Sequence, residues 1–107
     1  MTLRFADTVM PITERDFQRT VLDMARLFGW KDYFSWSSIH SPRGFPDLVL
    51  ARKRNDVVRL VLVELKSERG KLTEAQREWL GLLGQCPGVE VFVWRPSDWE
   101  ALQKTLE

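Results

Sequence analysis

Apolar and polar residues follow different spacings in three successive parts of this chain. The spacing in the first part predicts an amphipathic helix. Between positions 13 and 28 apolar residues recur every three or four places, the spacing of a helix with one buried face. Thr13 is a suitable N-cap for this helix and Gly29 a suitable stop. Four apolar residues share the predicted stripe: Phe17, Val21, Ala25 and Phe28.

The middle of the chain predicts three strands. Residues 31–39 are rich in aromatic and β-favouring side chains, and 40–44 favour a loop. Residues 46–53 and 56–66 predict two further strands, with the turn-forming pair Asn55 and Asp56 near their junction, so we expect an antiparallel hairpin. The second of these strands is apolar on both alternating sets of positions, which is typical of a central strand covered on both faces.

The remainder predicts a helix, a strand and a helix. Thr73 and Gln76 form a T-x-x-Q capping box for a helix that ends at about 83 or 84, and 89–94 predicts a strand. Ser97 and Glu100 form an S-x-x-E box for a terminal helix. The order αβββαβα predicts an α/β fold, a mixed central sheet flanked by helices.

Composition narrows the class of protein. A chain of 107 residues, 44% hydrophobic with five tryptophans, fits one packed domain spanning 1–107. Its one cysteine, Cys86, excludes an internal disulfide and the cysteine spacings of a zinc site. We find no signal-peptide pattern and no apolar segment long enough to cross a bilayer. We therefore expect a soluble cytoplasmic protein with no membrane partner.

Positive charge is concentrated in short segments of the sequence, and the chain as a whole is nearly neutral. The formal net charge is only +1, so nucleic-acid contacts would have to come from short basic segments. The alternative is that these segments are solvated loop tips. The candidates are His40, Arg43, Arg52, Lys53, Arg54, Arg69 and Lys71.

Two charges stand where an apolar strand ends. In "VLVELKS", Glu64 and Lys66 share one face of the predicted strand, and a structural ion pair is the simplest explanation. Asp47 follows Pro46 at the start of the preceding strand, and a hairpin would bring it to the same end. Two carboxylates and the backbone carbonyl of Leu65 would form a partial shell suited to Mg²⁺.

The helices contribute two further candidates. Glu14 falls in the middle of the apolar stripe of the first helix, so we expect it to face inward, although a first-turn acid also suits the helix dipole. Gln76 shares a face with apolar residues of its helix, and its capping role also accounts for it.

Four segments, taken in order, resemble the PD-(D/E)xK nuclease superfamily and its VRR-NUC branch, in particular the short standalone members of phages and bacteria. They are "TERDFQRTVLDMARLFGW", "GFPDLVL", "VELKSERGKLTEAQREWL" and "VEVFVWRPSDW", which span residues 13–99. The resemblance implies a restriction-endonuclease-like fold with Asp47, Glu64 and Lys66 at the three signature positions.

The same resemblance implies roles for these residues. Asp47 and Glu64 would bind Mg²⁺ or Mn²⁺, and Glu14 matches the helical acid that family members use near the metals. Lys66 would position water or stabilise charge. Two glutamines, Gln76 beside the metals and Gln18 on the first helix, also match family positions.

The implied function is hydrolysis of DNA phosphodiester bonds by a structure-specific endonuclease. For a short standalone chain the resemblance supports a homodimeric Holliday-junction resolvase acting on branched DNA. Alternatives are a flap or single-strand nuclease of the same fold, or a DNA-binding module without catalysis. Exposed tryptophans, with Trp30, Trp36 and Trp99 as candidates, would supply a dimer surface unless they belong to the core.

Overall fold

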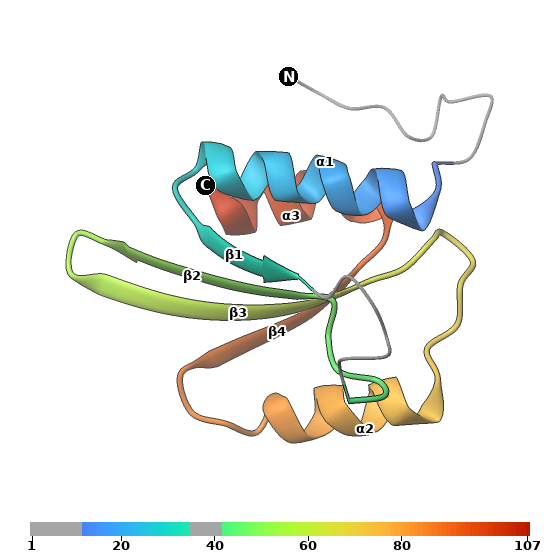
Figure 1. Cartoon of the computed structure of the whole chain (residues 1–107). Coiled ribbons are helices and arrows are strands. Elements are labelled where there is room, and N and C mark those ends of the chain that lie inside the picture. The colour runs from blue at the N-terminus through green and yellow to red at the C-terminus, as the bar shows by residue number, and fades with distance from the viewer. Residues whose placement is uncertain (1–11, 35–41) are drawn as a thin grey trace.

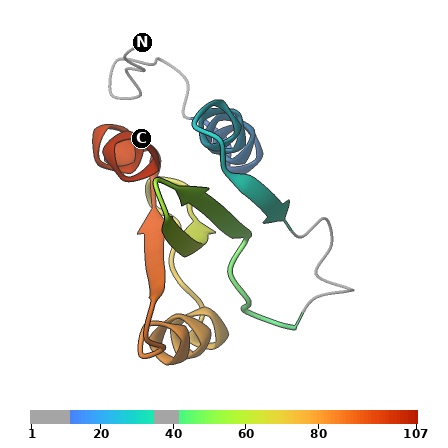
Figure 2. The ribbon, with the colours of Figure 1, turned by 90° about the vertical axis from the view of Figure 1, so that its left-hand side faces the viewer.

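A four-stranded sheet separates two layers of helices (Figure 1). The computed structural model describes residues 12–34 and 42–107. Helices α1 and α3 lie on one face of the sheet and α2 lies on the other (Figure 2). The elements are α1 (Glu14–Leu27), β1 (Lys31–Phe34), β2 (Leu48–Arg54), β3 (Val57–Leu65), α2 (Glu74–Leu83), β4 (Val89–Trp94), the 3₁₀ helix η2 (Pro96–Asp98) and α3 (Trp99–Leu106). The predicted α/β fold and its αβββαβα order are confirmed.

The sheet has the order β1-β2-β3-β4, so β3 is an interior strand as predicted. β1, β2 and β3 pair antiparallel, and β3 pairs parallel with β4. The hairpin turn is confirmed at Asn55 and Asp56, whose φ angles are 52° and 64°, as a two-residue turn with two left-handed positions requires. β2 begins two residues later than predicted, at Leu48. Only 31–34 of the first predicted strand lie within the described residues.

The main hydrophobic core lies between the sheet and the α1 and α3 layer. Alternation along β3 places Val61, Val63 and Leu65 in this core. Trp30 and Trp99 are only 4% and 3% exposed, so neither supplies an exposed dimer surface. Trp36 lies outside the described residues. The remaining core residues are Phe17, Val21, Leu22 and Ala25 of α1, Leu48 and Leu50 of β2, Trp94 of β4, and Leu102 and Leu106 of α3.

The start of the terminal helix differs from the prediction. Pro96 opens a 3₁₀ turn, and the Asp98 carboxylate accepts a hydrogen bond from the Arg95 backbone N–H at 2.8 Å. α3 then begins at Trp99, with no side-chain cap from its N-cap residue Asp98. The predicted Ser97 and Glu100 box is therefore wrong: the proline turn moves the helix start one residue along the chain. Within the described part of the chain, no helix is long and apolar enough to cross a membrane.

The loop before β2 packs tightly on α2. Gly44 has a φ of 84°, and a Cβ added there would lie 2.5 Å from the Ala75 carbonyl carbon. The neighbouring Phe45 ring meets the Trp79 ring edge-on, with centroids 5.0 Å apart. This close approach holds the segment that leads into Asp47 against the helix that carries Gln76.

We expect Gly44→Ala to destabilise the fold by more than its backbone angle alone requires. Gly29 provides the control because it also has a φ of 84°, but an added Cβ would meet nothing within 4 Å. Gly29→Ala should cost about 1–2 kcal/mol for the left-handed angle. Gly44→Ala should cost about 1–3 kcal/mol more through the clash with α2. Urea unfolding of both variants measures the difference, and equal losses would contradict the close packing.

Candidate active site

The β2–β3 register brings two carboxylates to one end of the sheet. Leu48 pairs with Val63, so the next step of the ladder places Asp47 opposite Glu64. The Asp47 carboxylate accepts a hydrogen bond from the Leu65 backbone N–H at 2.8 Å. Both side chains follow the parity that points away from the main core and toward α2. The hairpin therefore assembles the acidic pair proposed from the sequence.

Glu64 is a carboxylate enclosed by the protein. It is 2% exposed, and its Oε2 atom is buried without a hydrogen-bond partner. Burial and the neighbouring charge of Asp47 raise the pKa of Glu64 to about 8. Burial also raises the pKa of Asp47, although the hydrogen bond from Leu65 opposes this shift. A buried carboxylate with an unsatisfied oxygen is costly, and a bound cation is one arrangement that offsets the cost.

Gln76 connects the cap of α2 to the buried carboxylate. Its Oε1 accepts from the Thr73 backbone N–H at 2.8 Å, and its Nε2 donates to Glu64 Oε1 at 2.6 Å. The Thr73 hydroxyl completes the predicted capping box by accepting from the Gln76 backbone N–H. The two roles considered for Gln76 from the sequence are therefore compatible, because one amide group performs both.

We expect Gln76→Ala to lower any cleavage rate by about 10–100-fold, the usual effect of losing a hydrogen bond that orients a metal-binding side chain. It should also cost about 1 kcal/mol of stability through the lost cap. Thr73→Ala is the matched control, because it removes the cap hydroxyl but leaves the amide on Glu64. Thr73→Ala should lose similar stability with little change in rate. Equal rate losses in the two variants would show that Gln76 acts only through α2.

Lys66 and the loop after it are held by the end of β4. The Lys66 backbone N–H donates to the Trp94 carbonyl at 3.0 Å, and the positive charge of Lys66 lowers the pKa of both Asp47 and Glu64, against the larger effect of burial. Arg95 Nη1 then donates to the carbonyl oxygens of the loop. These acceptors are Ser67 at 2.7 Å, Gly70 at 2.6 Å and Glu68 at 3.4 Å.

Arg95 is a positioning residue that the sequence analysis missed. Its guanidinium fixes the loop joining Lys66 to α2, and Glu68 Oε2 strengthens this contact by accepting from the Ser97 backbone N–H at 3.0 Å. No pattern in the sequence separates this arginine from one on the surface, because its three acceptors are backbone carbonyls 25–28 positions earlier.

Glu14 lies at the start of α1 and is exposed, where the helical stripe predicts an inward-facing side chain. As a first-turn residue it extends beyond the covered part of the helix. Its negative charge still raises the pKa of Asp47 and of Glu64. Glu14 therefore influences the acidic pair electrostatically from the α1 side.

The oxygen atoms at this site would supply part of the coordination shell of a hard divalent cation. Asp47 and Glu64 offer carboxylate oxygens on one side of the strand end, and Glu64 Oε2 has no other partner. Within 12–34 and 42–107, no group of three or more His, Cys, Asp or Glu side chains is arranged to hold a metal ion. Two carboxylates and a backbone carbonyl would leave the remaining coordination positions to water and to a phosphate.

Two of the basic residues considered as nucleic-acid contacts instead hydrogen-bond to backbone carbonyl groups of the protein. Arg52 donates to the carbonyl oxygens of Phe28, Leu106 and Glu107 at 3.1, 2.8 and 3.1 Å. Arg54 donates to Phe28 and Glu107 at 2.9 and 3.2 Å. These guanidiniums satisfy carbonyl groups at the C-terminal ends of α1 and α3. They lie about 20 Å along β2 from its Asp47 end, at 3.3 Å per residue.

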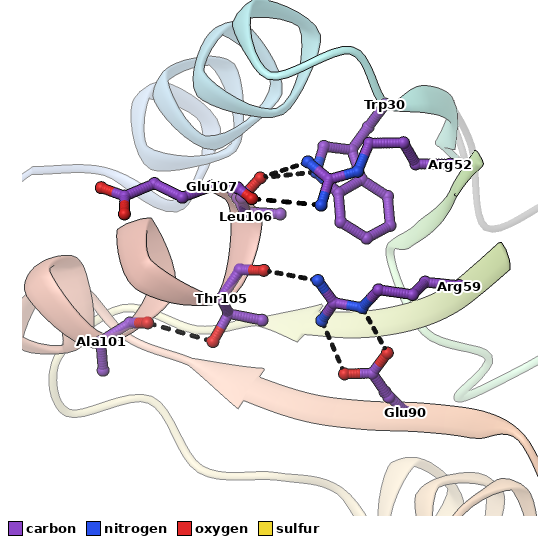
Figure 3. Close-up of polar contacts among 8 residues, drawn as sticks. All are labelled: Trp30, Arg52, Arg59, Glu90, Ala101, Thr105, Leu106 and Glu107. Atoms are coloured by element: carbon purple, nitrogen blue, oxygen red, sulfur yellow. Dashed lines mark hydrogen bonds and ion pairs between the residues drawn. The ribbon is translucent and has the colours of Figure 1, made fainter. Parts of the chain in front are cut away.

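A third arginine, not among the candidates, completes this cluster (Figure 3). Arg59 forms a two-point ion pair with Glu90 at 2.7 and 2.8 Å and donates to the Thr105 carbonyl at 3.0 Å. The guanidiniums of Arg52 and Arg59 lie 4.4 and 5.1 Å from the Trp30 ring. The cluster therefore joins the far end of the hairpin to α3 by charge-assisted hydrogen bonds and cation–π contacts.

The other nucleic-acid candidates lie in several places. Arg43, Lys53, Arg69 and Lys71 are exposed. Gln18 is half-buried on α1 and lines a groove together with Glu14. His40 lies outside the described residues. Among the described candidates, Arg43, Arg69 and Lys71 belong to loops adjoining the acidic pair, because they fall in the segments before β2 and after β3.

Comparison with known proteins bears on the family and the fold. The model of the VRR-NUC domain family matches residues 15–98. A solved structure described as a VRR_NUC domain protein is similar, with a TM-score of 0.66 and 20% sequence identity over 92% of this chain and 93% of that chain. At this identity the structural likeness shows the fold. Among curated proteins, no sequence matches at a significant level.

Proposed function

Since the chain belongs to the VRR-NUC domain family, whose domain implies a nuclease, we propose that it is a metal-dependent, structure-specific endonuclease that hydrolyses DNA. The observation that carries the proposal is Glu64: a buried carboxylate with an unpartnered oxygen, opposite Asp47 and hydrogen-bonded to Gln76. Such a group is costly when ionised, and either a proton or a bound cation offsets that cost.

Asp47, Glu64 and the Leu65 carbonyl would hold the cation, with Glu14 adding negative charge from the α1 side. A bound Mg²⁺ or Mn²⁺ supplies charge stabilisation at the scissile phosphate and makes a coordinated water more acidic. Gln76 keeps the Glu64 carboxylate oriented, and Lys66 provides a positive charge on the same face of β3. Lys66 would position the attacking water or offset charge on phosphorus.

The substrate we propose is branched DNA, cut by a homodimer acting as a Holliday-junction resolvase. One small domain carries one site, and symmetric incision of a four-way junction needs two sites related by a two-fold axis. A flap or single-strand nuclease is the alternative within the same chemistry. A module without catalysis is disfavoured, because it has no use for a buried and unpaired carboxylate.

Digestion of matched synthetic substrates in Mn²⁺ tests this function. A four-way junction, a flap, a nicked duplex and a plain duplex should be compared side by side, with chelator as the control. We expect metal-dependent cutting with preference for the junction, and a dimer in sedimentation at micromolar concentration. Preference for the flap would favour the alternative nuclease. No cutting of any substrate would overturn the proposal.

A further inference from the structure

A groove lies along α1, and one of its lining residues, Glu14, acts electrostatically on Asp47 and Glu64. The groove has a volume of about 490 Å³ and is lined by Glu14, Arg15, Gln18, Arg19, Leu22, Asp23, Arg26 and Phe34. Phe34, on the other wall, pairs with Leu48, which directly follows Asp47. The groove is therefore connected to the candidate site through two neighbouring elements.

Two arginines supply positive charge in a groove that is also lined by the acids Glu14 and Asp23. Arg15 and Arg19 are exposed and lie one helical turn apart, which places their Cβ atoms about 5–6 Å from each other. Within the described part of the chain, neither guanidinium forms a hydrogen bond or an ion pair. Arg26 differs, because it forms an ion pair with Asp32 at 2.8 Å.

An anionic ligand needs such charges because the site itself is acidic. When ionised, Glu14, Asp47 and Glu64 repel a phosphate, and among the described residues Lys66 is the basic residue whose charge lowers the pKa of Asp47 and of Glu64. The other strong cations of the sheet, Arg52 and Arg54, are bound to carbonyl groups at the far end of the hairpin. The span from Glu14 to Arg26 is about 18 Å along the helix, long enough for several backbone phosphates.

We propose that this groove binds the sugar-phosphate backbone of the nucleic acid next to the scissile bond, with Arg15 and Arg19 contacting successive phosphates. The proposal rests on the proposed function, which supplies the class of ligand, and it names the face of the molecule that receives it. Phosphate contacts of this kind position a substrate without reading its sequence.

Salt-dependent binding without cleavage tests the groove. Fluorescence anisotropy of a labelled synthetic junction in chelator measures affinity for the unaltered chain and for Arg15→Gln/Arg19→Gln. Each lost phosphate contact should reduce the slope of log affinity against log salt by roughly one. The control, Lys104→Gln, removes a positive charge from an exposed position on α3 and should leave the slope unchanged. In Mn²⁺, the arginine variant should raise KM more than it lowers kcat.

The outcomes distinguish a failure of the groove proposal from a failure of the nuclease assignment. If the unaltered chain cuts DNA but the two variants bind alike, the groove proposal is wrong and the nuclease assignment stands. If the arginine variant shows the reduced slope of log affinity against log salt while no substrate is cut in Mn²⁺, the groove proposal stands and the nuclease assignment fails. Absence of any binding by the unaltered chain would also overturn the groove.

Discussion

Replacing Asp47 by asparagine is expected to reduce metal-dependent DNA cleavage by more than about 100-fold, and Glu64→Gln should do the same. Both substitutions keep the shape of the side chain, and an asparagine oxygen can still accept from the Leu65 N–H. What each removes is a formal negative charge that the cation requires. Loss of a ligand should exceed the 10–100-fold effect of losing a residue that only orients one. Initial rates on the preferred substrate in Mn²⁺ measure the loss.

Glu90→Gln is the matched control for these substitutions. Glu90 is also a sheet carboxylate in a strong hydrogen-bonded pair, but its partner is Arg59, in the cluster at the far end of the hairpin. It should lose some stability and keep the cleavage rate. The assignment of Asp47 and Glu64 is contradicted if either variant cuts at the unaltered rate, or if Glu90→Gln loses activity to the same extent.

Most of the fold followed from local rules in the sequence. The capping box at Thr73 and Gln76, and the left-handed turn at Asn55 and Asp56, both depend on residues within a few positions of each other. The hairpin register that places Asp47 opposite Glu64 follows from that turn. The acidic pair was therefore foreseeable without any knowledge of tertiary packing.

Apart from the capping box displaced by the local turn at Pro96, the main predictions that differ from the structure concern long-range contacts. Arg52 and Arg54 look like free charges in the sequence, yet their acceptors are carbonyl groups up to 55 positions away. Arg95 holds a loop through backbone oxygens, which carry no sequence signal. Glu14 satisfies the helical period, but burial of a first-turn residue depends on what the rest of the fold places over it.

The stability of the metal-free protein is expected to fall as the pH rises from about 4.5 to 8. The pKa of Glu64 rises from an ordinary value of 4.5 to about 8 in the folded chain, so in this window the folded state holds a proton that the unfolded state has released. The stabilisation from Glu64 is complete below the unfolded pKa and is lost as pH rises through the folded pKa. Asp47 adds to the same trend, because its pKa is also raised.

One retained proton changes the free energy of unfolding by at most about 1.4 kcal/mol per pH unit. Glu64→Gln should therefore be more stable than the unaltered chain at pH 8, and its dependence on pH should be flatter, because a glutamine never ionises. A divalent cation should act in the opposite direction to the proton. Since it binds the ionised carboxylates, Mn²⁺ should stabilise the unaltered chain most at high pH and should have little effect on Glu64→Gln.

Urea unfolding in chelator and in Mn²⁺, repeated across this pH range for both chains, measures these effects. If the metal-free chain gains stability with rising pH, Glu64 is not a buried acid that holds its proton. If Mn²⁺ stabilises both chains equally, the cation does not bind through Glu64. The two results are independent of cleavage, because the first concerns the energetic cost of burying the carboxylate and the second concerns what offsets that cost.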